Sequence, residues 1–231
     1  MFQKSSKYYD IIYSFKDYKK EAEIIKTTIG EHNPDCKTIL DAACGTGEHL
    51  RYLKDYEIDG LDINREFIDI AKTKNPEGNY FLCDMKDFHI GKKYDVIMCL
   101  FSSIGYVLTV ENVIKTFVCF REHLNDRGLI IVEPWFTPDA WNPGKLHMVT
   151  AEHEGLKICR MNFSEVKDRI SFFTFHYLAG SREGIEYFNE YHEAGLFTKE
   201  EMKQSFAMAG LQAEYKEPGL SGRGLYMAHV F

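Results

Sequence analysis

A chain of 231 residues, 45% of them apolar and 17 of them phenylalanine, is long enough for one α/β domain with an elaboration. Its formal net charge of −7 argues against a broad nucleic-acid footprint, so a phosphate-bearing ligand would have to meet a few local cations. The six cysteines have no zinc-like spacing, and the sequence shows neither a signal peptide nor a membrane-spanning apolar run. We therefore expect a reduced, cytoplasmic protein without a metal site.

The first part of the chain alternates between apolar runs and amphipathic stretches. Residues 7–30 place apolar and aromatic side chains at helical spacing, and we expect this helix to cover a nucleotide site. The elements expected next are strand 38–41, helix 47–56, strand 57–62, helix 65–74, strand 79–83, strand 94–100, helix 111–124 and strand 128–133. Such alternation predicts a parallel sheet covered by helices on both faces.

The pattern changes near residue 134. Pro134, Pro138 and Pro143 break the chain, and the β-rich segment 146–193 predicts three or four strands with no helix between them. A glycine-containing stretch at 179–184 predicts a hairpin turn within this segment. An antiparallel insertion is therefore expected here.

Helical character returns after the insertion. Thr198 and Glu201 have the spacing of a capping box, which predicts a helix over 198–209 that stops at a glycine. Strands at 211–216 and 224–231 close the chain, and the hairpin between them makes the final strand antiparallel.

These elements together predict an α/β fold: a Rossmann-like, seven-stranded, mostly parallel sheet with helices on both faces, plus an antiparallel β insertion. Residues 1–134 and 195–231 would form the main domain, and 135–194 the insertion. An insertion above the carboxyl edge of a parallel sheet is well placed to enclose a small-substrate pocket.

The glycine-rich turn after the first strand carries the main functional signal. Gly45 and Gly47 allow a sharp turn and close approach of the backbone to a ligand. Asp62 ends the next strand, 21 residues past Asp41, where an α/β nucleotide site holds ribose hydroxyls. A dinucleotide site would want a third glycine where Leu50 stands. Asp41 instead suits a ligand with a cationic amino-acid end, although a turn used purely for chain reversal is the alternative.

Together these residues resemble the S-adenosylmethionine site of class I methyltransferases, and the likeness extends along most of the chain. The chain resembles the sugar N,N-dimethyltransferases that finish deoxyaminosugars such as desosamine and mycaminose on thymidine diphosphate. The matching pieces are Tyr9-Asp10-Ile11-Ile12-Tyr13, Asp41-Ala42-Ala43-Cys44-Gly45-Thr46-Gly47, Phe101-Ser102-Ser103-Ile104-Gly105-Tyr106, Glu122-His123-Leu124, Val132-Glu133-Pro134-Trp135 and Ser221-Gly222-Arg223-Gly224-Leu225. The insertion and a shorter segment after Tyr13 depart from that family, which leaves the particular sugar open.

The resemblance implies which residues hold the cofactor. Asp41 and Gly45 would contact its methionine end, Asp62 its ribose, and Asp84 and Met85 its adenine. Further contacts are expected from Ala42, Gly47 and Ile63, and from Leu100 and Phe101 where the reactive methyl would lie. A turn cap is the alternative for Asp84, and core packing is the alternative for Met85.

It also implies an acceptor side. Tyr13 and His123 are the catalytic candidates, each able to orient the substrate amine by hydrogen bonding without being an essential base. The alternative for Tyr13 is an ordinary helix aromatic, and for His123 a residue that interacts with the dipole at a helix C-terminus. Arg223 is the best cation for a diphosphate, because small neighbours let phosphate oxygens approach its guanidinium. The alternative for Arg223 is a side chain in a turn that points into solvent.

The remaining substrate-side residues are less distinctive. They are Ser103, Tyr106, Glu133 as a pocket carboxylate, and Trp135, which could stack on a base, wall the pocket or belong to the core. Four further histidines, His147, His153, His176 and His192, have no ligand-like grouping and are expected to be solvated or structural.

The sequence thus predicts an S-adenosylmethionine-dependent N-methyltransferase that acts, in two rounds, on the amino group of a TDP-linked deoxyaminosugar. Methyl transfer from a sulfonium needs mainly a neutral amine aligned behind the carbon. One alternative is a methyltransferase whose acceptor is another small amine, a carboxylate or a hydroxyl. The other is a non-catalytic regulator that binds the cofactor. The sequence leaves open whether the protein forms a homodimer. We expect neither nucleic acid nor a membrane as a partner.

Overall fold

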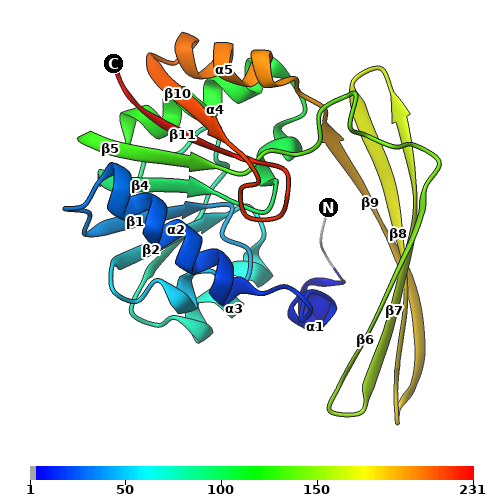
Figure 1. The fold of residues 1–231 in the computed structure, drawn as a ribbon. Helices are drawn as coiled ribbons and strands as arrows, with labels where there is room; N and C mark the ends of the chain where they lie inside the picture. Colours follow the sequence, from blue (N-terminus) through cyan, green and yellow to red (C-terminus); the bar gives the residue numbers. More distant parts are fainter. Residues whose placement is uncertain (1–3) are drawn as a thin grey trace.

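The computed structural model describes residues 4–231 and contains two separate β-sheets (Figure 1). The larger sheet has seven strands in the order β10-β11-β5-β4-β1-β2-β3. Their bounds are β1 Thr38–Ala42, β2 Glu57–Asp62, β3 Asn79–Leu82, β4 Tyr94–Cys99, β5 Leu124–Val132, β10 Leu211–Lys216 and β11 Leu225–Val230. Strands β1 to β5 pair in parallel, and β11 pairs antiparallel with both β5 and β10. The predicted sheet and its antiparallel final strand are confirmed.

Helices cover both faces of this sheet. On one face α2 (Tyr18–His32) and α3 (Arg65–Lys74) bury their apolar sides against β1, β2, β4 and β5. On the other face α4 (Val110–Glu122) and α5 (Lys199–Met208) pack together. The rings of Phe117 and Phe206 stack between these two helices with centroids 3.8 Å apart. The α/β architecture is therefore layered as the alternation of elements predicted.

Two expected helices differ from the structure. The segment 7–30 is broken into η1 (Ser6–Tyr8), α1 (Tyr9–Ile12) and α2, because the Asp17 side chain accepts a hydrogen bond from the Lys20 amide and caps a new helix. The predicted helix over 47–56 is wrong: the segment holds the short 3₁₀ turn η2 (Leu50–Tyr52).

The conformation of the glycine turn explains why no α-helix forms over 47–56. Gly47 has φ +74°, a left-handed conformation that is incompatible with a helix starting there. Leu50 and Leu53 are nevertheless fully buried, so their spacing reflects packing of the turn against the sheet.

The second sheet is an antiparallel meander in the order β6-β7-β8-β9. Its strands are β6 Leu146–His153, β7 Leu156–Lys167, β8 Ile170–Ser181 and β9 Gly184–Gly195. The β8–β9 turn lies inside the predicted stretch 179–184, since Ser181 pairs with Gly184. Figure 1 shows α1 between the two sheets, and Tyr8 and Ile12 pack there against the inner face of the meander.

Within residues 4–231 no helix is long and apolar enough to cross a membrane. The same described residues contain no group of three or more histidine, cysteine or acidic side chains arranged to hold a metal ion.

Candidate active site

A cavity of about 280 Å³ lies between the carboxyl edge of the large sheet and the inner face of the meander. Its wall from the large sheet comes from the turns that follow β1 to β5. The lining side chains include Tyr9, Tyr13, Ala43, Gly45, Asp62, Ile63, Asn64, Asp84, Met85, Lys86, Phe101, Ser103, Tyr106, Trp135, Phe173, Phe175, Ala194 and Arg223. A smaller hollow of about 40 Å³ shares the lining residues Gly45 and Phe101 with it and reaches Asp41 and Leu100. Ligand sites of open α/β sheets lie at this edge.

The Asp62 carboxylate fixes the glycine loop, which is the turn after β1 that contains Gly45 and Gly47. One oxygen of its carboxylate accepts the Gly45 amide hydrogen at 2.9 Å and the other accepts the Asn64 amide hydrogen at 2.8 Å. Burial raises the pKa of Asp62, while the backbone N–H groups, which stabilise the charged form, work in the opposite direction. The carboxylate therefore joins the end of β2 to the turn after β1 and still lines the cavity.

Asp41 is a buried carboxyl group without a full set of partners. It is 2% exposed, and its Oδ1 accepts no hydrogen bond from residues 4–231. Burial, and secondarily the charge of Asp62, raise the pKa of Asp41 well above its ordinary value. A buried oxygen of this kind is costly unless a ligand donates to it. Its position beside the small hollow fits the cationic end of an amino acid.

The two glycines of the loop have different tasks. A Cβ on Gly45, whose φ is +55°, would meet nothing within 4 Å, so its open side faces ligand space. A Cβ on Gly47 would lie 2.8 Å from Asn75 Nδ2, because Gly47 is turned against α3. Gly47 and Ala42 thus lie outside the cavity, although both were predicted to contact the cofactor. Ala43, at φ +66°, borders both hollows instead.

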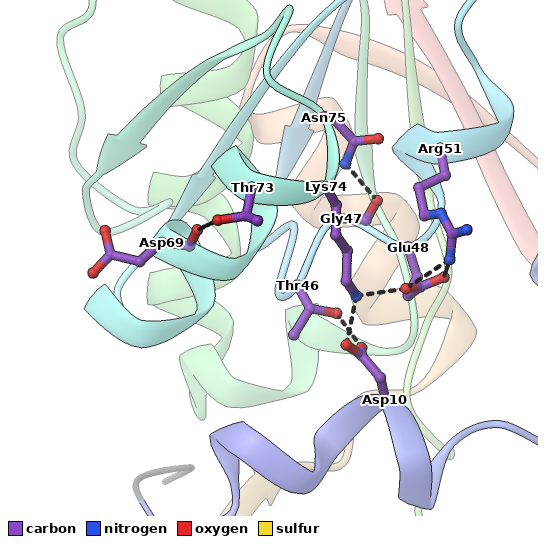
Figure 2. Close-up of polar contacts among 9 residues, drawn as sticks. All are labelled: Asp10, Thr46, Gly47, Glu48, Arg51, Asp69, Thr73, Lys74 and Asn75. Atoms are coloured by element: carbon purple, nitrogen blue, oxygen red, sulfur yellow. Dashed lines mark hydrogen bonds and ion pairs between the residues drawn. The ribbon is translucent and has the colours of Figure 1, made fainter. Parts of the chain in front are cut away.

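Charged contacts fasten the N-terminal segment to the same loop (Figure 2). Asp10 of α1 accepts a hydrogen bond from Thr46 Oγ1 at 2.6 Å, and its other oxygen lies 2.5 Å from Lys74 Nζ. Lys74 at the end of α3 also contacts Glu48, 2.5 Å away. These contacts hold the segment that carries Tyr9 and Tyr13 over the cavity.

A second buried cluster borders the small hollow. Glu21 of α2 accepts hydrogen bonds from Lys16 Nζ and from His49 Nε2, the latter at 2.8 Å. Burial tends to raise the pKa of Glu21, but the two hydrogen bonds hold it below its usual value, so the carboxylate is charged. Lys16 also lies 4.6 Å from the centroid of the Phe101 ring, which brings a cation to the edge of the site.

The turns after β2 and β3 supply the far end of the cavity. Asp84 and Met85 both line it, together with the half-exposed Ile63. Asp84 also accepts a hydrogen bond from the Lys86 amide at 3.0 Å. It therefore caps a turn, which was the alternative to a cofactor contact that the sequence offered. The cap leaves the carboxylate at the cavity wall, where a hydrogen-bond acceptor for an exocyclic amino group would be needed.

Glu133 lies outside both hollows, although it was predicted to be a pocket carboxylate. It is completely buried at the end of β5 and accepts hydrogen bonds from the Phe101 amide at 2.7 Å, from Ser221 Oγ, and from Arg223 Nη2 at 3.2 Å. Phe101 has φ +51°, a strained conformation for a residue with a side chain. Glu133 therefore positions the turn after β4 and directs Arg223, which does line the cavity.

The acceptor-side candidates divide into two groups. Tyr13 lines the cavity, and its hydroxyl accepts a hydrogen bond from Arg160 Nη1 at 2.8 Å. Ser103, Tyr106 and Trp135 also line the cavity, and Trp135 Nε1 donates to a hydroxyl of the meander at 3.0 Å. The structure thus brings these four side chains to the wall of the 280 Å³ cavity, which forms the chamber of the site.

His123 lies elsewhere. It follows the last residue of α4, its Nδ1 is 2.8 Å from the Cys119 carbonyl oxygen, and its ring packs on Phe88 with centroids 4.3 Å apart. Its carbonyl accepts the amide hydrogen of Tyr94 at the start of β4, so it lies at the amino edge of the sheet, opposite the cavity. The expected role of His123 beside the acceptor amine is therefore wrong. His123 is instead a residue at the C-terminal end of α4.

Sequence reasoning missed several residues of the chamber. They are Tyr9, Asn64, Lys86, Phe173, Phe175 and Ala194 in the wall, and Arg160 and His192 directly behind it. The inner residues of β7 to β9 alternate with exposed ones, and that signal was present in the sequence. Alternation does not say which face of a strand meets a cavity.

Comparisons with known proteins agree with this geometry. The sequence profile described as "Methyltransferase domain" matches residues 39–128. The chain is 34% identical over 223 residues to the dTDP-3-amino-3,6-dideoxy-alpha-D-glucopyranose N,N-dimethyltransferase of Streptomyces fradiae, covering 94% of this chain and 88% of the relative. The crystal structure of Streptomyces venezuelae DesVI matches with a TM-score of 0.92 and 31% identity, covering 96% of this chain and 97% of that one.

A further structural neighbour carries a cofactor. CalS10 of Micromonospora echinaspora, described as an amino pentose methyltransferase in its SAM-bound form, matches with a TM-score of 0.86 and 28% identity over 99% of this chain and 97% of that one. The fold and the glycine loop thus define a methyltransferase. Within that class, the chain belongs to the family that contains the Streptomyces fradiae enzyme and DesVI.

Replacing Glu133 tests its positioning role. The Glu133→Ala variant leaves Arg223, Ser221 and the Phe101 amide without their shared acceptor, so we expect the free energy of unfolding to fall by about 3 kcal/mol or more. Urea titration followed by circular dichroism measures it. Glu217→Ala, which breaks the exposed Glu217–Lys199 pair, is the matched control and should unfold like the wild type. Equal midpoints for the two variants would contradict the assignment.

Proposed function

We propose that this S-adenosylmethionine-dependent methyltransferase dimethylates the amino group of a TDP-linked deoxyaminosugar. The observation that carries the proposal is that one chamber joins Asp62 and the glycine loop at one end to Arg223 at the other. The whole-length similarity to the Streptomyces fradiae N,N-dimethyltransferase supports the same acceptor class.

The residues of the carboxyl edge fit the cofactor. The unsatisfied Asp41 oxygen would accept from its ammonium group, and Asp62 would accept from ribose hydroxyls with the lone pairs that the loop amides leave. Asp84 and Met85 would meet adenine. When bound, the cofactor supplies a methyl group that its sulfonium has already made electrophilic.

The chain's own residues align and shield the acceptor. Tyr13 and Phe101 meet edge to face with ring centroids 5.0 Å apart, and Trp135 closes the side toward the meander. An aromatic wall stabilises cations while it excludes water. The protein's main task is then to present a neutral amine in line with the methyl carbon.

Arg223 is placed to bind the diphosphate. Its guanidinium lies at the cavity wall, 5.9 Å from the Trp135 ring centroid, and a bond to Glu133 orients it while leaving N–H donors for phosphate oxygens. A nucleoside diphosphate could thus extend from this arginine with its sugar in the chamber.

We also propose that the enzyme is a homodimer that pairs the outer faces of two meanders. Apolar side chains on that face are strongly exposed: Met148 at 62%, Phe163 and Leu178 at 50%, and Ile185 at 80%. Large exposed apolar side chains that gather on one sheet face typically mark a protein interface. Action in the cytoplasm stays a prediction.

Mass spectrometry tests the acceptor. Incubation of the enzyme and cofactor with TDP-amino-sugars should add one and then two methyl masses to at least one of them. In the Arg223→Ala variant the acceptor KM should rise by about tenfold to a hundredfold with little change in kcat, because a charge-assisted bond worth about 1.5–3 kcal/mol is lost. Arg182→Ala, at the exposed β8–β9 turn, is the matched control.

Two outcomes would count against the proposal. A set of TDP-amino-sugars that gains no methyl mass removes the nucleotide-sugar acceptor. An Arg223→Ala variant with the wild-type KM would mean that the acceptor carries no diphosphate and would favour another small amine, a carboxylate or a hydroxyl.

The dimer is tested by sedimentation velocity. We expect the wild type to sediment as a dimer and Phe163→Arg to sediment as a monomer, because the charge would be buried against the apolar partner face. Met208→Arg, which replaces a side chain that is 70% exposed on α5, is the matched control and should remain dimeric. A monomeric wild type would overturn the proposal.

A further inference from the structure

A chain of polar groups runs from the cavity wall into the interior of the meander. Tyr106, in η3 (Ser103–Val107), lines the cavity, and its hydroxyl oxygen lies 3.1 Å from His192 Nδ1 on β9. On the other side of the imidazole, Nε2 lies 3.9 Å from Glu190 Oε2. The side chains of His192 and Glu190 are 0% and 5% exposed. Of the two roles that the sequence suggested for His192, the buried position excludes the solvated one and leaves the structural one.

The surroundings hold the imidazole in place. The His192 ring stacks on Phe173 with centroids 5.6 Å apart and a 5° interplanar angle, and Phe173 itself lines the cavity. Glu190 accepts a hydrogen bond from the Ser5 amide at 3.0 Å and another from the Ser5 hydroxyl. The N-terminal segment therefore fixes the carboxylate that fixes the histidine.

The order of donors along this chain follows from the charges. A carboxylate on the Nε2 side favours the tautomer with its proton on Nε2, which leaves Nδ1 as an acceptor for the Tyr106 O–H. The Tyr106 oxygen then keeps lone pairs for an N–H group in the cavity. We infer that Tyr106 and His192 form a relay that takes the proton from the substrate amine. This inference rests on the proposed function.

The proton states of both groups are consistent with such a relay. Burial is the main reason that the pKa of Tyr106 is raised, so the phenol is neutral. Burial also lowers the pKa of His192, and so does the charge of Arg160, while Glu190 works in the opposite direction. A neutral imidazole at working pH is ready to accept a proton, and the nearby carboxylate stabilises the imidazolium that results.

The step balances in protons and electrons. The substrate ammonium gives a proton to the Tyr106 oxygen while the phenolic proton moves to His192 Nδ1, leaving a neutral amine, a neutral phenol and an imidazolium. The amine lone pair then forms the N–C bond as the S–C bond breaks, and the electron pair of that bond stays on sulfur. His192 releases its proton to water before the next round, in which the methylated ammonium is deprotonated in the same way.

Kinetics of a histidine variant tests the relay. His192→Asn can still hydrogen-bond to Tyr106 but cannot take a proton, so at pH 7 we expect kcat on the TDP-amino-sugar that the wild type methylates to fall by about a hundredfold. Above the pKa of the substrate amine most of that loss should disappear, because the amine arrives already neutral. The double variant with His192→Asn and Tyr106→Phe should have nearly the same kcat as His192→Asn alone, because both substitutions break the same relay.

A matched histidine lies away from the cavity and from the meander. The His89 side chain, in the segment between β3 and β4, is 78% exposed and does not line the cavity. His89→Asn should therefore keep wild-type kcat at every pH. Binding of S-adenosylhomocysteine, measured by calorimetry, should be the same in both asparagine variants. A loss of kcat in His192→Asn that is equal at all pH values, or the absence of a loss, would overturn the relay.

A second measurement is independent of turnover. In ¹⁵N spectra of the wild type bound to S-adenosylhomocysteine, His192 should be the neutral Nε2–H tautomer, and Tyr106→Phe should shift its Nδ1 signal. An Nδ1–H tautomer, or an Nδ1 signal that ignores Tyr106→Phe, would reject the relay. If the wild type methylates no TDP-amino-sugar, the proposed acceptor fails on its own and these spectra alone decide the relay.

Discussion

The carboxylate of Asp62 is the constraint on which the site depends. Its two oxygens take the amide hydrogens of Gly45 and Asn64, so the turn after β1 and the start of α3 are set by one side chain at the end of β2. Because parallel strands end at a common edge, the turns after β3, β4 and β5 lie along the same edge as this turn. The α1 segment is fixed to the same loop through Asp10 and Lys74 (Figure 2).

The second sheet turns this edge into a chamber. Its inner face supplies apolar wall residues such as Phe173, and directly behind them it holds polar groups such as Arg160 and His192. Each of these two reaches a tyrosine of the other layer, Tyr13 or Tyr106. Glu133 performs the corresponding task for Arg223 from the carboxyl end of β5. Buried polar side chains thus orient groups that line the cavity.

Much of the large sheet could be predicted from the sequence, because βα alternation and the glycine turn are local signals. The helix expected over 47–56 failed because Gly47 is packed against Asn75, a contact that adjacent sequence does not reveal. His123 could have been placed correctly, since a helix that crosses between parallel strands starts at the carboxyl edge and ends at the amino edge. His192 could not, because the register and docking of the antiparallel strands decide which of their residues meet the cavity.

Calorimetric titration with S-adenosylhomocysteine tests the central claim most directly, since this product shares the amino-acid, ribose and adenine groups of the cofactor. The wild type should bind one equivalent per chain. Asp62→Asn should bind at least about tenfold more weakly, because the amide has one acceptor oxygen where the carboxylate has two and loses a charge-assisted bond. Absence of binding heat in the wild type, or equal affinity in the variant, would contradict the account.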